Sequence, residues 1–576
     1  MWGRDEALRF IKIVIFPMAI FFLSFAPAGV AAQTLPEGVM RILEAEAERG
    51  LGDLEELVNY CEHLMENRID VNRATEWELA AFPLLSPFQV ASIVEYRDQY
   101  GAILSAGELA QVDGFNDRKV EVLLPFITFG SGASIRPSAG ERGEHKLILR
   151  GGDKFDQREP FNWYGKYQFR VEDKLQVGST LSRKGVSAHL KVGNVPLGSG
   201  WDIRSAVVGD YTVRLGQGLL LWNSFSLSGT GAPASLLKLG NGVVQYTASS
   251  PEEAFRGLGA TLLYGDRWDG SIFYSEQEDR VTGGSIGFNG NGWRLGLNGV
   301  AWQNEAWAGG ISADAVWSLG RYRFFGEAAF DSDGDEAALI GAILPLDATF
   351  ECSAMVRWYS PDYSAQYAGA FSSISSCKDQ LGGVVNILWI QQRELLFRGY
   401  VDVVYYPAPR WGVKVPSFEV ESSCEGEWTK GESKLMLRWR YRFYGYEGRH
   451  QQGIRLHYSY HPASGFYMAA RAEVVWNNLA TSSPLEPGVA LYAECGYTPL
   501  RKKWEVADRG TLYHIDKWEN RIYFYERDLP QSFSVPALYR RGWDLYGYIK
   551  YAPLSRVGLY LKVSTKMLKG QINLTF

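Results

Sequence analysis

Seven polar residues near the middle of the chain are the first candidates for a site. They fall in two short stretches, each of which mixes carboxylates with an arginine. The seven are Asp210, Tyr211, Arg214, Gln217, Glu252, Glu253 and Arg256. Opposite charges that are buried together can brace a wall or line a path through a protein. We predict that Asp210 and Glu252 or Glu253 pair with Arg214 or Arg256. A permeation or ligand site is the alternative.

Signatures of catalysis and of metal binding are sparse. The seven histidines include no HExxH pattern, and no Gly-x-Ser-x-Gly occurs at an expected strand-to-helix turn. The acidic run from Asp331 to Ala338 lacks the spacing and the final Glu of an EF-hand, so we expect an exposed turn. Cys352 and Cys377 could pair in an oxidising compartment or stay unpaired. We predict a non-enzymatic protein with no cofactor and no metal; a hydrolase whose triad comes from distant strands stays open.

A basic and aromatic stretch, RWRYRFY, runs from Arg438 to Tyr444. Bases mixed with aromatics can stack on nucleic acid. On a strand, however, successive side chains alternate, so the arginines share one face and Trp439, Tyr441 and Phe443 share the other. That separation favours arginines inside a barrel and an aromatic girdle outside it over one mixed surface for DNA.

The long C-terminal region must position these residues. From His145 onward, segments such as KLILRGG, WRLGLNGVAW and WDLYGYIKYAP alternate between apolar and polar residues and are separated by turn residues. Leu559 and Leu561 alternate with Tyr560 and Lys562, which fits a lipid-facing side and a wet lumen. The region is too large for one sandwich, and at roughly twenty residues per strand and turn it would supply about twenty strands.

The two ends of the chain agree with a barrel in a bacterial outer membrane. Three basic residues precede an apolar run over 13–25, and small residues up to Ala32 offer a cleavage site, as in an export signal. An uncleaved anchor helix is the alternative, although Pro17 interrupts the run and Pro27 follows it. The last strand, over 570–576, alternates and ends on Phe576. It resembles the closing strand of bacterial outer-membrane barrels. The seven candidate residues would then lie in the lumen.

Residues 33–130 have a helical texture. The stretch 33–68 is rich in Glu and predicts an acidic helical segment. The sequences IDVNRATEWELAAFP, VASIVEYRDQYGAILSAGELAQVDGF and VEVLLPFITF follow. They resemble the tandem helix-hairpin-helix module of ComEA-type competence proteins, with Tyr96-Arg97 and Tyr100-Gly101 in the family places. The resemblance implies two hairpins that present backbone N–H groups to DNA phosphates.

The hairpins depart from the family pattern. Leu84 and Ser86 stand where the family has glycines, and the second hairpin keeps only one. The residues that would meet DNA are Pro83, Leu84, Ser86, Gly114, Asn116 and Lys119. Between residues 69 and 130 four basic residues face nine acidic ones, a local net charge of about −5, whereas phosphate contact needs clustered Lys and Arg. We predict a protein-contact or plugging role, with DNA binding as the alternative.

Three further segments resemble large Bacteroidota proteins that join such a module to an outer-membrane barrel: VVGDYTVRLGQGLLLWNSF, SSPEEAFRGLGATLLYG and RWYSPDYSAQYAGAFS. We therefore expect an α+β multidomain chain, in which a small all-α module precedes a large antiparallel transmembrane β-barrel. The expected divisions are a signal (1–32), an acidic segment (33–68), the module (69–130), a linker (131–144) and the barrel (145–576). The expected partners are outer-membrane lipid and a periplasmic protein. A DNA-uptake component, with DNA as partner, is the alternative.

Overall fold

The computed structural model describes most of residues 68–130 and 143–576, and single positions between 44 and 65. Outside the description lie 1–43, 45–54, 56–57, 60, 62–63, 66–67, 75–78, 80–81, 83–84, 86, 117–118, 121–122, 131–142, 156–160, 172–173, 225–232, 266, 278, 304–305, 348, 392–393, 411, 463–464, 480–485, 500–502 and 555. The predicted export signal and the first hairpin, with Pro83, Leu84 and Ser86, fall outside the described residues.

The N-terminal module is a small helical unit closed by a two-stranded clasp. Its helices α6 (Pro87–Tyr100) and α7 (Ala106–Leu109) lie between strand β1 (Ile69–Asp70) and strand β2 (Ile127–Thr128), which pair in parallel. Arg97 of α6 donates to the carbonyls of Val71 and Ala74 at 3.0 and 2.7 Å, which ties the helix to the start of the module. The Ser105 side chain caps α7 by accepting from the N–H of Glu108.

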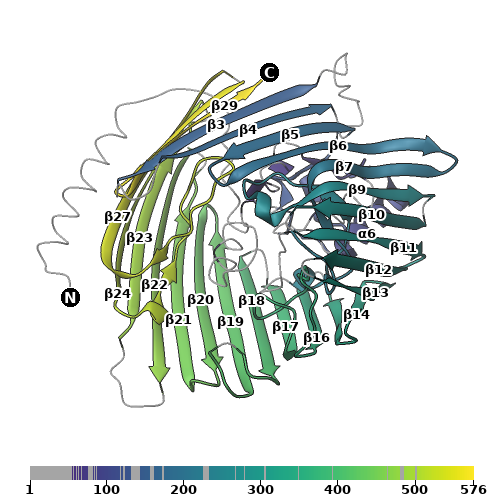
Figure 1. The fold of residues 1–576 in the computed structure, drawn as a ribbon. Coiled ribbons are helices and arrows are strands. Elements are labelled where there is room, and N and C mark those ends of the chain that lie inside the picture. Colours follow the sequence, from purple (N-terminus) through teal and green to yellow (C-terminus); the bar gives the residue numbers. More distant parts are fainter. Residues whose placement is uncertain are drawn as a thin grey trace, which may run out of the picture.

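The C-terminal region is a closed barrel (Figure 1). Among the described residues its wall has 24 antiparallel strands. They are β3 (Glu144–Lys154), β4 (Asn162–Val171), β5 (Leu175–Ser182), β6 (Gly185–Gly198), β7 (Trp201–Arg214), β9 (Phe255–Tyr264), β10 (Trp268–Glu276), β11 (Arg280–Gly290), β12 (Trp293–Gln303), β13 (Trp307–Leu319), β14 (Tyr322–Asp331), β15 (Glu336–Pro345), β16 (Phe350–Tyr359), β17 (Gln380–Gln391), β18 (Leu395–Tyr406), β19 (Ser417–Lys430), β20 (Ser433–Tyr444), β21 (Arg449–Tyr460), β22 (Phe466–Leu479), β23 (Gly488–Tyr497), β24 (Trp504–Ile515), β27 (Arg540–Leu554), β28 (Val557–Ser564) and β29 (Met567–Thr575). The predicted fold class is confirmed.

The last strand closes the ring against the first. β29 pairs with β3 in the register Thr575↔Lys146 to Met567↔Lys154, and Phe576 exchanges backbone hydrogen bonds with His145. A short strand, β8 (Gly242–Gln245), pairs only with the end of β7, because β7 also pairs with β9 along most of its length. β8 therefore lies inside the barrel, next to a wall that is continuous without it.

The two faces of the wall differ as the alternation predicts. On β28, Leu561 is 39% exposed while Lys562 is 1% exposed. Apolar side chains are exposed around the ring: Ile272, Leu297, Ile311, Ile340, Val356, Val385, Val403, Leu437, Leu456, Leu491, Ile549 and Leu561. Exposed aromatics stand near both rims, among them Trp201, Trp268 and Trp293 at one end and Trp163, Trp307 and Trp543 at the other. An apolar belt between aromatic girdles is the surface of a barrel that crosses a bilayer.

The connections between strands are long at one end only. At the end where β3 begins and β29 finishes, every connection is short. The lengths range from two residues, as in 291–292, to six residues, in 498–503. At the opposite end, three long connections span 215–254, 360–379 and 516–539. Single-chain outer-membrane barrels have short turns on the periplasmic side and long loops outside the cell. We refer to the two ends as the short-turn end and the long-loop end.

The long connections fold into the lumen and pack on its wall. Leu219 and Leu237 join inward residues of β13 to β17 and Phe371 in one apolar cluster. The connections 215–254 and 360–379 also bond to each other, since Trp222 donates to the carbonyl of Tyr367. The connection 516–539, which contains 3₁₀ turn η4 (Trp518–Asn520) and strands β25 (Ile522–Tyr523) and β26 (Ala537–Leu538), packs on β22 and β23. The first connection also holds η2 (Pro233–Leu236) and η3 (Pro251–Glu253).

In the part of the chain that the structure describes, no helix is both long and apolar enough to cross a membrane. All five cysteines are free thiols, so the possible pairing of Cys352 with Cys377 is not formed. The acidic run at Asp331 is a turn in which the Asp331 carboxylate accepts from the N–H groups of Asp333 and Asp335, as expected.

Candidate plug and lumen site

The centre of the candidate site is Glu44, from the acidic N-terminal segment. Its carboxylate oxygens lie 2.6 Å from Arg455 Nη1 and 2.6 Å from Arg471 Nη1, and Oε1 also accepts from the N–H of Tyr525 at 2.8 Å. The Glu44 side chain is 3% exposed. Burial by itself raises the pKa of this carboxyl, but Arg471 and Arg455 outweigh burial and hold the pKa well below its ordinary value. Glu44 is thus a buried anion held by two wall arginines.

Alternation along two neighbouring strands puts both arginines on the lumen side. Arg455 of β21 lies an even number of positions from three buried residues, so it points to the same side of the strand as they do. These residues are Gln451, His457 and Ser459. Arg455 is also held by Glu473 of β22, through Nε at 2.7 Å and Nη2 at 3.1 Å. Arg471 lies over the rings of Tyr492 and Phe524, with its guanidinium carbon 5.3 and 5.5 Å from their centroids. Both guanidinium groups therefore have supports other than Glu44.

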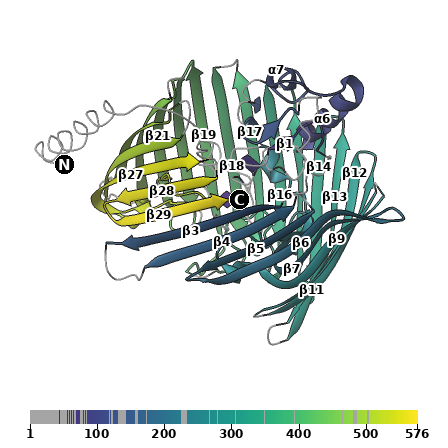
Figure 2. The same cartoon turned by 90° about the horizontal axis from the view of Figure 1, so that it is seen from above.

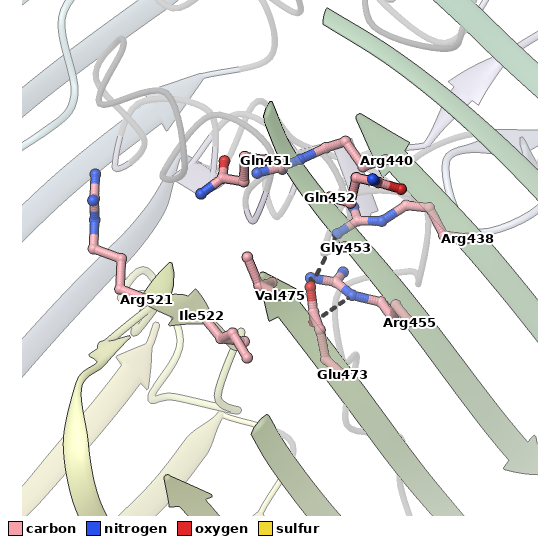
Figure 3. A pocket seen from close by; sticks show the side chains of 10 residues that line it. All are labelled: Arg438, Arg440, Gln451, Gln452, Gly453, Arg455, Glu473, Val475, Arg521 and Ile522. Carbon is pink, nitrogen blue, oxygen red and sulfur yellow. Dashed lines mark hydrogen bonds and ion pairs between the residues drawn. The ribbon is translucent and has the colours of Figure 1, made fainter. Parts of the chain in front are cut away.

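More arginines surround this point. Figure 3 shows Arg438 and Arg440 of β20 beside Arg455, with Arg521 of the long connection facing them across a cavity of about 20 Å³. Among the residues that the structure describes on β20, β21 and β22, the lumen side carries one carboxylate, Glu473, which also lies 3.4 Å from Arg438. The stretch RWRYRFY places its arginines inside and exposes Trp439 outside, as the alternation predicts. On the neighbouring strand β19, Glu421 pairs with Arg442 at 3.0 Å, so Glu44 is one of several carboxylates that offset the positive charge of this wall.

The N-terminal segment reaches the opposite wall as well. The Asn59 side chain donates to the carbonyl of Thr247 at 3.2 Å, and the Ser249 hydroxyl donates to the Glu55 carboxylate at 2.5 Å. Thr247 and Ser249 follow β8, which lies on the far side of the ring of strands from β21 and β22. The contacts of this segment therefore span the lumen from wall to wall.

The module itself shares an apolar core with the long connection 516–539. Tyr525 belongs to the same buried cluster as Leu79, Ile93 and Phe126 of the module, and Phe533 and Val535 pack against that cluster. Figure 2 shows α6 and α7 at the mouth of the barrel, near β14 and β17. α6 contacts β14, and Lys119 of the module contacts Glu351 at the start of β16. Because β16 starts at the short-turn end, this mouth is the short-turn end.

The second hairpin of the module faces the barrel wall. Lys119 Nζ lies 3.3 Å from the Glu351 carboxylate of β16 and 3.1 Å from the carbonyl of Gly114. The N–H of Gly114 donates to the side chain of Asp113, and the N–H of Lys119 donates to the side chain of Asn116. Gly114 has φ +83°, which its place in the tight turn requires. The groups that would hold a phosphate are thus engaged by carboxylates and an amide of this chain.

The seven residues predicted as one network divide between the two sides of the wall. Asp210 and Arg256 do pair, with Asp210 Oδ1 2.7 Å from Arg256 Nε. Arg256, however, shares the outer face of β9 with the exposed Leu258, and its side chain is 45% exposed. The prediction of a lumen position is therefore wrong for this pair. The apolar residues at 258 and 262, two and six positions after Arg256, already indicated the outer face.

Three of the seven lie inside. The Tyr211 hydroxyl donates to the carbonyl of Tyr274 at 2.8 Å. Arg214 donates to the Ser224 hydroxyl at 2.6 Å. The N–H of Gln217 donates to Glu327 Oε2 at 2.8 Å. Glu252 and Glu253 are exposed on η3, so the prediction that they line a lumen network is wrong.

The residues that bind the N-terminal segment to the wall were not among the candidates that the sequence offered. Glu44 is one of several glutamates in an acidic segment, and nothing in its neighbours distinguishes it. Arg471 stands in the strand-like run FYMAARAEVVW, two positions before Glu473, so the sequence indicated that the two side chains share a face. It gave no sign that Arg471 binds Glu44, which lies 427 positions earlier. Glu327 and Glu351 were also passed over, although each alternates with outward apolar or small residues.

Comparison with known proteins agrees with the N-terminal module. A family model described as a helix-hairpin-helix motif matches residues 65–128, which confirms the predicted helix-hairpin-helix module. Among curated protein sequences there is no significant match.

Solved structures with a similar barrel include an iron transporter, a siderophore receptor and OccK5 (OpdH). The FrpB iron transporter from Neisseria meningitidis has a TM-score of 0.40 at 9% identity, over 76% of this chain and 83% of its own. OccK5 (OpdH) from Pseudomonas aeruginosa has 0.30 at 8%, over 75% and 97%. The siderophore receptor PirA from Pseudomonas aeruginosa has 0.37 at 7%, over 76% and 80%. At such values the likeness carries no information on what this chain binds or transports.

Proposed function

We propose that this protein is a non-enzymatic outer-membrane barrel whose N-terminal segment and helix-hairpin-helix module plug the lumen from the periplasmic side. The observation that carries the proposal is the insertion of Glu44 between Arg455 and Arg471, together with the core that the module shares with Tyr525. A buried carboxylate far from the barrel in sequence is costly unless it is paired, so its pairing here marks a specific docked state.

The orientation follows from the connections. The module lies at the short-turn end, where the first strand begins, and short turns are periplasmic in outer-membrane barrels. The apolar belt would face the acyl chains and the aromatic girdles the headgroups. The expected lipid partner is thus the outer membrane. A periplasmic protein that holds or withdraws the module is the expected protein partner.

Conductance across a planar bilayer tests the plug. The full chain with Glu44→Ala should open more often than the wild type, since two buried arginines lose the carboxylate that they bind. Glu95→Gln is the matched control, because Glu95 is an exposed glutamate of α6 whose side chain accepts from Gln99 of the same helix. Equal conductance of wild type and Glu44→Ala would remove the plugging role.

DNA uptake is the second candidate, and the helix-hairpin-helix match favours it. Against it stand the excess of acids in the module and the engagement of Lys119 by Glu351. We expect the full chain in detergent to show no saturable change in the fluorescence anisotropy of a labelled duplex, even in low salt. A sub-micromolar, salt-sensitive dissociation constant would place DNA uptake first.

A further inference from the structure

We propose that Glu44 occupies a binding site for the carboxylate group of a small organic acid. This inference rests on the proposed plug, and it names the chemistry of the solute that the lumen would recognise. In the docked state the side chain of Glu44 stands in for the ligand. A solute carboxylate that takes its place would release the N-terminal segment from the wall.

The donors around Glu44 match a planar carboxylate. One oxygen is bound by Arg455, while the other is bound by Arg471 and by the N–H of Tyr525, at 2.6, 2.6 and 2.8 Å. Two arginines and a backbone N–H that converge on two coplanar oxygens form a charge-assisted receptor of the kind that recognises carboxylates. A tetrahedral phosphate would present a third and a fourth oxygen, whereas the three donors that Glu44 contacts among the described residues face two oxygens.

The receptor is held in place without its present occupant. Glu473 grips Arg455 with two hydrogen bonds, and Tyr492 and Phe524 flank Arg471. Tyr525 presents its N–H from a connection that is itself fixed, because its carbonyl accepts from Arg509. Withdrawal of Glu44 would therefore leave the three donors close to their present positions. Little free energy of binding would then be spent on ordering the site when a ligand enters.

The surroundings favour an anion that comes from the lumen. The cavity lined by Arg438, Arg440 and Arg521 adjoins Arg455 and has a volume of about 20 Å³, enough for one water molecule (Figure 3). Loss of the Glu44 charge raises the positive potential at this wall. A small carboxylate would restore the balance, whereas a neutral solute would leave the arginines without the charge that they now contact.

Chemical rescue tests the site. Propionate has the three carbons of a whole glutamate side chain, the carboxylate included, so it should bind the full-length Glu44→Ala variant in detergent, measured by isothermal titration calorimetry. We expect one site per chain and a dissociation constant on the order of 1 mM, as for a very small ligand. Sodium chloride at the same ionic strength should give no saturable heat.

Two variants sharpen the test. Glu44→Gln keeps the shape of the side chain and fills the site, so it should bind propionate at least tenfold more weakly than Glu44→Ala. The double variant Glu44→Ala/Arg471→Ala lacks one of the two guanidinium groups. It should also bind propionate at least tenfold more weakly than Glu44→Ala. Equal binding by all three variants, or no saturable binding by Glu44→Ala that retains its barrel by circular dichroism, would overturn the proposal.

The outcome is separable from that of the plug. If Glu44→Ala conducts more than wild type but does not bind propionate, the plug stands and the carboxylate site is wrong. If Glu44→Ala binds propionate but conducts as the wild type does, the site stands and gating by Glu44 is wrong. Tighter binding of inorganic phosphate than of propionate would also overturn the assignment to carboxylates.

Discussion

At the scale of single residues, buried carboxylates hold the contents of the lumen to its wall. Glu44 binds two wall arginines from the plug side, and Glu327 of β14 binds the long connection 215–254 from the wall side. Glu327 Oε2 accepts from the N–H groups of Gln217 and Leu219 at 2.8 and 3.0 Å, and Oε1 accepts from the Ser312 hydroxyl at 2.6 Å. Gly216 makes this possible, since its φ is +53° and a Cβ there would lie 2.8 Å from Glu327 Oε1.

The pH dependence of the plug should follow Glu44. A carboxyl whose pKa is lower in the docked state than in the released state stabilises docking above its ordinary value of 4.5 and loses that contribution as the pH falls below it. Conductance should therefore be flat from pH 8 to about pH 5 and should rise below about pH 4.5. Glu44→Gln should lack this rise; an equal rise in both proteins would assign it to other groups.

Loss of Glu327 should loosen the connection that it binds. Glu327→Ala leaves two buried N–H groups without an acceptor, at a cost of about 2–5 kcal/mol in the free energy of unfolding. Glu327→Gln keeps one acceptor oxygen and should cost less. Urea unfolding in lipid vesicles measures both, with Glu276→Ala, an exposed glutamate of β10, as control. A cost for Glu327→Ala no larger than that of the control would contradict the clamp.

At the scale of elements, the three long connections place protein inside the cylinder of strands. They begin at the long-loop end and fold inward, where they build apolar clusters with the inner faces of the strands. The connection 516–539 contacts both the wall and the module, because Phe524 packs on the wall while Tyr525 packs in the core of the module. Adjacent residues of an extended segment point to opposite sides, so one connection can join two bodies.

Removal of the Tyr525 ring should free the module from the barrel. Cys61 is buried in the same cluster and is a free thiol, so its alkylation rate reports exposure of that core. Tyr525→Ala should raise the rate at Cys61 at least tenfold, because loss of a buried aromatic costs about 3–5 kcal/mol. Tyr523→Ala is the matched control: Tyr523 lies in the same connection and outside that cluster. Unchanged alkylation at Cys61 would show that the module docks by other contacts.

At the scale of the whole molecule, the barrel separates a lipid-facing surface from a charged interior. The inner face carries ion pairs such as Arg357–Asp402, at 2.9 Å with both side chains buried, while the outer face at the same height is aliphatic. A 24-strand ring is wide, and the interior charges are satisfied by inserted protein as well as by the wall. Charges of the wall are therefore paired with residues of the N-terminal segment as well as with one another.

The lipid-facing surface can be tested by charge. Leu561→Arg places a guanidinium group in the outer apolar belt and should destabilise insertion by about 2–4 kcal/mol. Leu346→Arg is the control, since Leu346 is equally apolar but lies in the turn after β15, at the rim, where the cost is about 0–1 kcal/mol. Equal effects of the two variants on folding into vesicles would argue against a bilayer around this wall.

The sequence by itself determined the class of the fold and the face on which most side chains lie. Period-two alternation is local, so Leu561, Lys562 and the arginines of RWRYRFY could be assigned to a side from their neighbours alone. The helix-hairpin-helix module was equally visible, since its turns and capping residues are contiguous. Only the tertiary structure decided which carboxylate meets which arginine. Glu44 and Arg455 are 411 positions apart, and their contact exists because ring closure and three inward connections bring them together.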